Sequence, residues 1–460
     1  DTIYKYDPTI KTGEKVSPLY IDLSEDEWQD NIVRSYSNNN VGDYTVSINE
    51  LLVGFTHNYD CFFAPVKGGE VKQISYDHGS ISSMQFLDNR RMVISKLDNG
   101  IVKLFVATAD SIITLSPIEW FGEDSLCVSD LGKDKNGRWY FKYADYYSHQ
   151  KVAIADSGLI NIRPVKTPWA VTTNFAFSED GNYALYGCMR DDNYVKELYL
   201  YDVKADTSKR ILADDGWLDN LVWMPDNRSI LLTRNQDIYR LDLVPRDEFE
   251  LDKDPWEEIL NQEKSKPDST NEEMYYDENG YLVLDIVAEE NKTETNNKLE
   301  IVWEGIEKRF YPIIIAKDNY NFVLDTISDS TFYYVEDANQ PNKNNYLKKA
   351  NIYGKNQKEV FNFGSTANAY CKVNSTVYYL VQGELKSYNL ATSSRKDIKV
   401  NYDYQYDKAL LNQRVFEEAW SAFGNNFYDP DMHNVSWKEL FRLYRPYVDK
   451  TKNIYDVALI

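Results

Sequence analysis

Short apolar strands alternate with polar turns along most of the chain, and this pattern recurs about every 45 residues. Each unit has a first strand, a turn built on Asp or Asn, and a strongly apolar second strand, as in MQFLDNRRMVIS and FAFSEDGNYALYG. A third alternating strand and a more polar fourth strand follow. One four-stranded antiparallel sheet cannot bury both of its faces, so such units stack radially. The pattern therefore predicts an all-β fold, a seven-bladed β-propeller with a short C-terminal α-helical extension; a β-sandwich is the alternative.

The turn residues should lie between the first two strands of each blade. An Asp or Asn side chain can bond its own backbone there and tolerates a left-handed conformation. The turn residues of the seven copies are Asn49, Asp88, Asn136, Asp180, Asp226, Asp329 and Asn374.

The ends of the chain do not follow the repeat. We expect residues 1–22 to be the tail of a preceding propeller and a linker, residues 23–403 to be the propeller, and residues 404–460 to be a helical start of another domain. From Phe416 to Phe427 the apolar period changes to 3.6 residues. Ser436 and Glu439 have capping-box spacing, so a second helix should begin at Trp437 and end before Pro446.

Asn453 is placed to cap a third helix, whose apolar face is incomplete at Ile460. We therefore expect the natural protein to continue.

An acidic insertion, about residues 246–298, interrupts the fifth copy. Between Arg246 and Asp277 there are 12 acidic residues against 3 Lys and Arg246 itself. Asp254 and Pro255 have the residue types of a helix N-cap and first position. We interpret the insertion as a solvated acidic excursion from the outer part of the blade; a gate over one mouth of the propeller is the alternative.

The charge balance excludes some classes of partner. Lys and Arg number 51 against 73 Asp and Glu, a net charge of −22. This charge repels phosphate backbones and anionic headgroups, so we expect no nucleic acid partner. No apolar stretch is long enough to cross a bilayer, so we expect no membrane insertion.

The four cysteines, Cys61, Cys127, Cys188 and Cys371, lack the spacing of zinc or thioredoxin motifs. We interpret them as buried apolar fillers.

The chain has few residues suited to catalysis. It lacks the nucleophile-elbow, zinc-protease, P-loop, EF-hand and dinucleotide-binding motifs. A Ser–His–acid triad needs an imidazole, and the only histidines are His57, His78, His149 and His433. We interpret the first three as solvated turn histidines. We therefore expect no catalytic residue and no cofactor here; a serine, imidazole and carboxylate within bonding reach inside the blades would contradict this.

One loop has metal-binding residue types. Asp429, Asp431 and His433 alternate closely, but carboxylates flanking Pro430 are also typical of loops and caps. No further ligand has recognisable spacing, so we expect no metal site.

Three segments, in order along the chain, resemble the tricorn protease family. EEAW at 417–420, FYDPDMHNVSW at 427–437 and YRPY at 444–447 resemble the start of that family's core domain, which commonly reads M-H-G-V-D-W; Asn434 and Ser436 replace the Gly and Asp. IVWEGIEKRFYPI at 301–313 resembles the I-D-x-x-G-I-x-x-R end of a blade in the family's second propeller, and the N-terminal hairpin is similar to the exit from its first. The residues carrying the match, which we expect to be structural, are Trp303, Gly305, Ile306, Arg309, Trp420, Tyr428, Asp429, Pro430, Met432, His433, Trp437, Tyr444 and Pro446.

The resemblance implies a serine peptidase with two propellers, a helical core segment, a PDZ-like domain and a peptidase core, assembled as a homo-hexamer. In that family the seven-bladed propeller is thought to admit peptides to the active site, and the catalytic residues lie later in the chain than any position here. We therefore expect this chain to be the non-catalytic, substrate-admitting propeller part of a tricorn-like serine peptidase, inactive alone. Its expected partners are peptides or unfolded polypeptide, the remaining PDZ-like and peptidase domains, and further copies of itself.

Two alternatives remain open at this point. One is a TolB-like propeller that binds a protein partner. The other is the propeller of a dipeptidyl-peptidase-like serine hydrolase, which would require a Gly-x-Ser-x-Gly elbow in downstream sequence. The acidic, Tyr- and Asn-rich composition favours a bacterial periplasm over the cytoplasm.

Overall fold

The computed structural model describes most of the chain. The described residues are 31–98, 101–109, 115–117, 127–134, 136–144, 150–190, 193–245, 301–328, 330–338, 340–427, 429 and 432–460, together with Thr9 and four short strands. Those strands form two hairpins, β1 (Tyr4–Tyr6) with β2 (Val16–Pro18) and β24 (Met274–Tyr276) with β25 (Leu282–Leu284).

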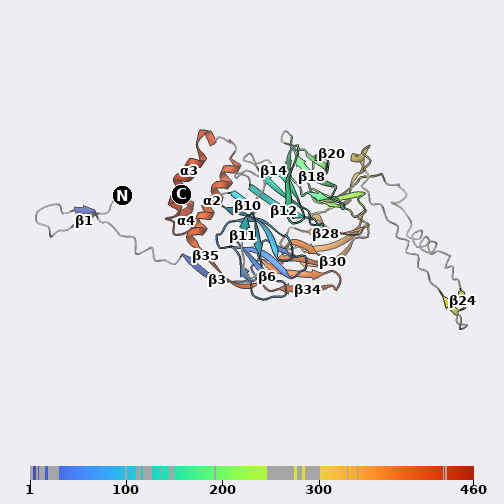
Figure 1. Ribbon diagram of the computed structural model, residues 1–460, viewed down its shortest axis with the longest axis horizontal. Helices are drawn as coiled ribbons and strands as arrows, with labels where there is room; N and C mark the ends of the chain where they lie inside the picture. The colour runs from blue at the N-terminus through green and yellow to red at the C-terminus, as the bar shows by residue number, and fades with distance from the viewer. Residues whose placement is uncertain are drawn as a thin grey trace.

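Seven antiparallel sheets follow one another along the chain, each built from consecutive strands (Figure 1). Blade one has β4 (Tyr44–Val46), β5 (Leu52–His57), β6 (Asp60–Pro65) and β7 (Lys72–Gln73). Blade two has β8 (Ile81–Phe86), β9 (Arg91–Asp98), β10 (Ile101–Thr108) and β11 (Leu115–Pro117). Blade three has β12 (Cys127–Lys133), β13 (Trp139–Ala144), β14 (Gln150–Asp156) and β15 (Ile160–Val165).

The other blades repeat this order. Blade four begins with a split strand, β16 (Ala170–Val171) and β17 (Ala176–Phe177), before β18 (Tyr183–Met189), β19 (Lys196–Asp202) and β20 (Thr207–Asp214). Blade five has β21 (Leu218–Trp223), β22 (Ser229–Arg234), β23 (Asp237–Asp242) and, after the insertion, β26 (Phe310–Ile314). Blade six has β27 (Tyr320–Ser328), β28 (Thr331–Asp337), β29 (Asn345–Asn351) and β30 (Lys358–Gly364), and blade seven has β31 (Ala367–Val373), β32 (Thr376–Val381), β33 (Glu384–Asn389) and β34 (Ser394–Ile398). The predicted seven-bladed propeller is confirmed.

The predicted turn chemistry is confirmed in most blades. Asp88 accepts a hydrogen bond from the backbone N–H of Arg90 at 2.8 Å, and Asp226 does the same for Arg228 at 2.8 Å. Asn49 and Asp180 make the equivalent contacts, and Asn374 has a φ of 48°.

Blade three is an exception. Asp134, and not the predicted Asn136, accepts from the backbone of residues 136 and 138, because the turn begins two residues earlier. Asp329 and the predicted short helix and gate of the insertion lie outside the described residues.

None of the described blades combines strands from the two ends of the chain, so the ring is closed in another way. Instead, β3 (Ile32–Asn38) pairs with β35 (Asn401–Asp407) in a separate two-stranded ribbon, which we call the clasp. Phe55 and Phe62 of blade one form one buried cluster with Tyr378 and Leu385 of blade seven and Tyr402 of the clasp. Backbone bonds add to this closure, such as Val41 N–H to the Gly383 carbonyl at 2.9 Å.

Three helices follow the clasp and lie on its side of the propeller (Figure 1). Helix α2 (Lys408–Asn426) is capped by Asp407, whose carboxylate accepts from the N–H groups of residues 409 and 410. A one-turn 3-10 segment, η4 (Met432–Asn434), precedes α3 (Trp437–Val448), and α4 (Ile454–Ala458) follows. Ser436 and Asn453 cap α3 and α4 as predicted.

Helix α3 does not end before Pro446. It continues to Val448, which is buried with Phe416 and Val457 at the centre of the helical cluster. A proline removes one backbone donor, and this cost is small in a last turn that is held by apolar packing.

Removing a buried ring from the closure should destabilise the whole propeller. Phe62→Ala is expected to lower the free energy of unfolding by about 3–5 kcal/mol, because Phe62 has no exposed surface. Tyr36→Ala is the control, since Tyr36 lies on the clasp but is 60% exposed, and a change under about 0.5 kcal/mol is expected. Denaturant unfolding followed by tryptophan fluorescence measures both, and equal losses would contradict a closure held by buried aromatic packing.

Candidate functional site

The first strands of successive blades contact one another, which places them nearest the propeller axis. Most of these strands are irregular. A register shift interrupts β8, β12, β21, β27 and β31, and the first strand of blade four is split. A bulge leaves one residue unpaired and turns side chains away from the regular alternation.

Polar side chains of the preceding blade bond the backbone that these bulges release. Ser83 accepts from the N–H of Leu131 at 2.9 Å, and Asn220 accepts from the N–H of Val323 at 2.8 Å. Asn174 both accepts from the N–H of Leu221 and donates to its carbonyl, at 2.7 and 2.9 Å. The inner wall is therefore tied together from blade to blade. Sequence analysis missed these residues, although their spacing follows the repeat.

Three carboxylates lie on these inner strands, and we call them the acidic belt: Asp130, Asp219 and Asp325. Lys142 pairs with Asp130 at 2.9 Å, and Lys372 of the next blade pairs with Asp325 at 2.5 Å. The Asp219 carboxylate instead accepts a backbone bond from Asn220 at 2.8 Å.

The acidic belt also acts on a neighbouring phenol. Burial, with added repulsion from Asp130 and Asp219, raises the pKa of Tyr140 to about 12. Tyr140 therefore stays neutral beside the acidic belt.

A cavity of about 430 Å³ lies against this wall and takes residues from the inner strands of blades two to six. Phe177, Trp223 and Leu324 give it apolar surface, and its charged residues are Lys133, Asp134, Glu179 and Asp325. Such a mixture of a few charges among aromatic residues is typical of ligand-binding surfaces.

A buried serine, carboxylate and imidazole do occur together in blade one. Asp60 lies in the middle: Ser75 donates to Asp60 Oδ1 at 2.9 Å, and His78 Nδ1 lies 2.7 Å from Asp60 Oδ2. In a catalytic triad the imidazole must lie between the serine and the carboxylate. Here His78 Nε2 instead accepts from the backbone N–H of Asp407 at 2.9 Å, and all three side chains are buried. The cluster therefore docks the clasp onto blade one and cannot activate the serine.

The prediction that His78 is a solvated turn histidine is wrong, because it is 1% exposed and bonded on both ring nitrogens. His57 is partly exposed: its ring packs on Tyr404 and Tyr402 at 4.8 and 5.7 Å, and burial lowers its pKa. His149 lies outside the described residues.

The described residues contain no group of three or more His, Cys, Asp or Glu side chains arranged to hold a metal ion. His433 is exposed and lies 3.1 Å from Asp429, while Asp431 is outside the described part. None of the described helices is both long and apolar enough to span a membrane.

The interpretation of the cysteines as buried fillers is confirmed for Cys61 and Cys188, and Cys371 is half-buried. Burial raises the pKa of Cys188 to about 12 and of Cys371 to about 11, so both stay thiols. The side chain of Cys127 is not described.

Comparison with known proteins adds to this geometry. The family model of the tricorn protease C1 domain matches residues 412–460. The crystal structure of a tricorn protease aligns over 99% of this chain and 43% of its own length, with a TM-score of 0.67 and 14% identity. The resemblance to the tricorn protease family is therefore confirmed.

Other solved structures share less. A puromycin hydrolase variant covers 78% of the chain with a TM-score of 0.47 and 9% identity, and 53% of its own length is aligned. A prolyl endopeptidase covers 80%, also with a TM-score of 0.47 and 9% identity, and with 50% of its own length aligned. The curated protein sequences contain no significant match. The chain thus spans less than half of the length of the tricorn protease that it resembles.

The tricorn-like residues of blade five close the base of the insertion. Gly305 takes a positive φ of 65° before a short 3-10 turn, η3 (Ile306–Arg309), and Ile306 is buried. Arg309 donates to the carbonyls of Asp242 and Glu304 at 3.0 and 2.9 Å, and also to those of residues 243 and 302. One guanidinium therefore holds both ends of the insertion together. Trp303 packs beneath Lys209, whose Nζ lies 3.5 Å from its ring centre.

The tricorn-like loop between α2 and α3 is a chain of left-handed residues. Met432, His433 and Asn434 all have positive φ, with 64° at Asn434. This conformation explains why Asn can replace the family's Gly, since both tolerate it. Ser436 in turn replaces Asp as the helix N-cap, where either residue type is suitable.

The aromatic residues of the same segment hold the helices together. Trp420 stacks on Trp437 at 4.0 Å and lies near Tyr444. These motif residues thus pack the helices, while Tyr428 and Pro430 lie outside the described part.

Removing His78 should loosen the clasp. His78→Ala leaves the buried Asp60 without its ring partner, so we expect a loss of about 3 kcal/mol in unfolding free energy and faster hydrogen exchange at the Asp407 amide. His433→Ala is the matched control: its side chain is 60% exposed, and a change under about 0.5 kcal/mol is expected. Unchanged exchange at Asp407 in the His78 variant would show that the imidazole does not hold the clasp.

Proposed function

We propose that the chain is the non-catalytic, substrate-admitting propeller part of a tricorn-like serine peptidase. The observation that carries the proposal is the cavity formed by the inner strands of blades two to six. A cavity of about 430 Å³ has room for a short extended segment and not for a folded domain. It would therefore admit unfolded polypeptide and exclude folded domains.

The residues that line the cavity favour peptide binding that is weak and depends little on the sequence of the peptide. Aromatic and aliphatic surface from Phe177, Trp223 and Leu324 can contact many side chains, and the charged groups Lys133 and Asp325 add polar contacts. A conduit must release what it binds, and polar side chains spread along the lining, such as Gln85, Asn174 and Thr326, would let a peptide exchange one weak contact for another.

The negative charge of the chain predicts which peptides it binds. The net charge of −22 raises the local concentration of cationic peptides near the molecule. Along the inner wall Asp219 has no lysine within ion-pair distance in the described residues, unlike the paired Asp130 and Asp325. Cationic peptides should therefore associate more than anionic ones.

The partners and the compartment belong to the same proposal. The helical segment that matches the C1 domain is where the PDZ-like and peptidase domains would join, and residues 23–403 and 404–460 are the two units we assign to propeller and core start. By resemblance the assembly is a homo-hexamer that acts on peptides. We keep the bacterial periplasm as the proposed compartment.

A pair of peptides tests the proposal. A fluorescent Lys-rich heptapeptide should bind more tightly than a Glu-rich one at low salt, and the difference should fade at about 1 M salt, where the Debye length is about 3 Å. Asp219→Asn should weaken binding of the Lys-rich peptide about threefold. Glu359→Gln, on the outermost strand of blade six, removes the same charge away from the axis and should change binding far less. Equal binding of the two peptides at low salt, or equal effects of the two variants, would overturn the proposal.

A further inference from the structure

The strand β35 has one edge that β3 does not use. The backbone bonds from Lys408 N–H to the Asn31 carbonyl and from Asn39 N–H to the Val400 carbonyl, both 2.9 Å, fix the phase of their pairing. In an antiparallel pair the hydrogen-bonding direction alternates from one residue to the next. The N–H and C=O groups of Asn401, Asp403, Gln405 and Asp407 therefore face the opposite edge, toward blade one.

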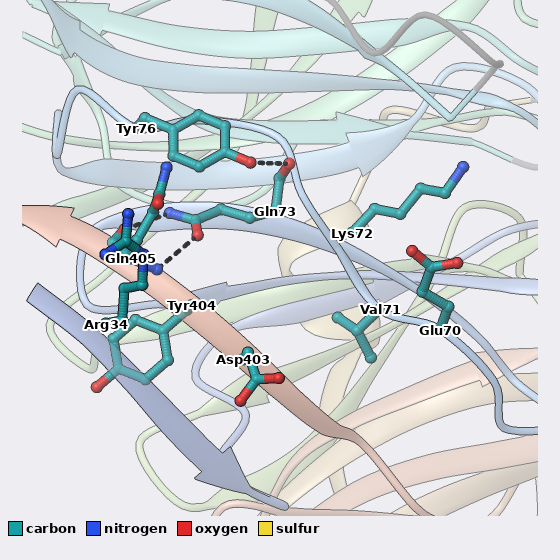
Figure 2. A pocket seen from close by; sticks show the side chains of 9 residues that line it. All are labelled: Arg34, Glu70, Val71, Lys72, Gln73, Tyr76, Asp403, Tyr404 and Gln405. Atoms are coloured by element: carbon teal, nitrogen blue, oxygen red, sulfur yellow. Dashed lines mark hydrogen bonds between the residues drawn. The ribbon is translucent and has the colours of Figure 1, made fainter.

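Side chains of blade one occupy two of these four positions. The Gln73 amide donates to the Gln405 carbonyl at 2.9 Å and accepts from its N–H at 3.1 Å (Figure 2). His78 Nε2 accepts from the N–H of Asp407 at 2.9 Å. These are the bonds that a neighbouring strand would make, so the Gln73 side chain stands where a peptide group would fit.

Beyond Gln73 the edge opens into a pocket of about 490 Å³ (Figure 2). One wall is β35 at Asp403 and Gln405, and the other is the segment from Glu70 to Gln73. Here β7 is only two residues long while its neighbour β6 has six, so blade one supplies little strand to cover β35. Within the described residues, nothing bonds the outward N–H or C=O of Asp403.

The charged groups around this pocket are also unused. Arg34 and Lys72 are exposed cations, and Glu70 and Asp403 are exposed carboxylates. None of the four forms an ion pair with another described residue. An incoming segment would therefore meet open backbone groups along one wall and charges of both signs around it.

We propose that the open β35 edge at Asn401 and Asp403, next to Gln73, binds an extended peptide as an added strand. Backbone hydrogen bonds supply the affinity in this mode of binding, and side chains contribute through the flanking surface. The fitting ligand has no proline, favours an extended backbone, and carries a basic and an acidic residue for Glu70 and Asp403 and for Arg34 and Lys72. The pocket volume suits a segment of a few residues and not a globular surface. This site lies outside the ring of inner strands and does not depend on the proposed function of the cavity.

The test uses the 460-residue chain and one defined probe. The probe is a dye-labelled, N-acetylated and C-amidated heptapeptide of sequence KTVTVTE, followed by fluorescence anisotropy. Asp403→Pro removes one outward N–H that β3 does not use, and proline is tolerated at such an edge position. We expect this variant to bind at least about tenfold more weakly, and Asp403→Asn, which keeps the N–H, to bind within about threefold of the unaltered chain.

Two further arms keep the result interpretable if Asp403→Pro does not fold. The same probe N-methylated at every residue has no backbone N–H to donate to a strand edge, and it should lose binding to the unaltered chain. Gln73→Ala frees the N–H and C=O of Gln405, so it should tighten binding several-fold. Asp219→Asn, which alters the inner wall, should leave binding of this probe unchanged.

Each contrary outcome overturns the proposal. Full binding of the N-methylated probe, or equal binding by the Pro and Asn variants at position 403, would place the peptide elsewhere. Loss of binding in Asp219→Asn would place it in the central cavity. A concentration-dependent dimer that Asp403→Pro abolishes would make a second copy of the chain the occupant of the edge.

Discussion

The fold depends on one seam, where blade seven meets blade one. No blade among the described residues contains strands from both ends of the propeller, so backbone pairing within a blade does not close the ring. Aromatic packing takes its place, with Phe55 and Phe62 stacked at 5.3 Å and Tyr402 set against both. The clasp then fixes the two ends of the propeller to each other. Because each blade is covered only by its neighbours, opening this seam would expose the apolar faces of two blades at once.

The bulged inner strands have two roles: they join neighbouring blades, and they carry the side chains that face the propeller axis. Strands near the axis are crowded, and a bulge allows each of them to bend while it releases backbone groups. Ser83, Asn174 and Asn220 satisfy those groups across the gap to the next blade. The polar residues that hold the blades together are thus on the same strands as the acidic belt, so the stability of the wall and its electrostatics are set by adjacent positions.

Much of this architecture is predictable from sequence because it is local. The repeat, most of the Asx turns and the caps at Ser436 and Asn453 each depend on residues within a few positions, and sequence predicts them for that reason; in blade three the turn residue is Asp134 and not Asn136. The burial of His78 is not local, since its partner Asp407 is 329 residues away in sequence. The pairing of β3 with β35 and the persistence of α3 through Pro446 have the same origin. In each case a contact between residues far apart in the sequence overrides the local preference, and that contact forms only in the folded chain.

Arg309 fixes the closure of blade five. Its guanidinium gathers carbonyls from Asp242 and Leu243 on one side of the insertion and from Val302 and Glu304 on the other. The two attachment points are fixed to each other by the blade itself, so the closure of the fourth strand does not rely on the intervening polypeptide. The strand register of blade five is therefore independent of the length and composition of the segment inserted between residues 245 and 301.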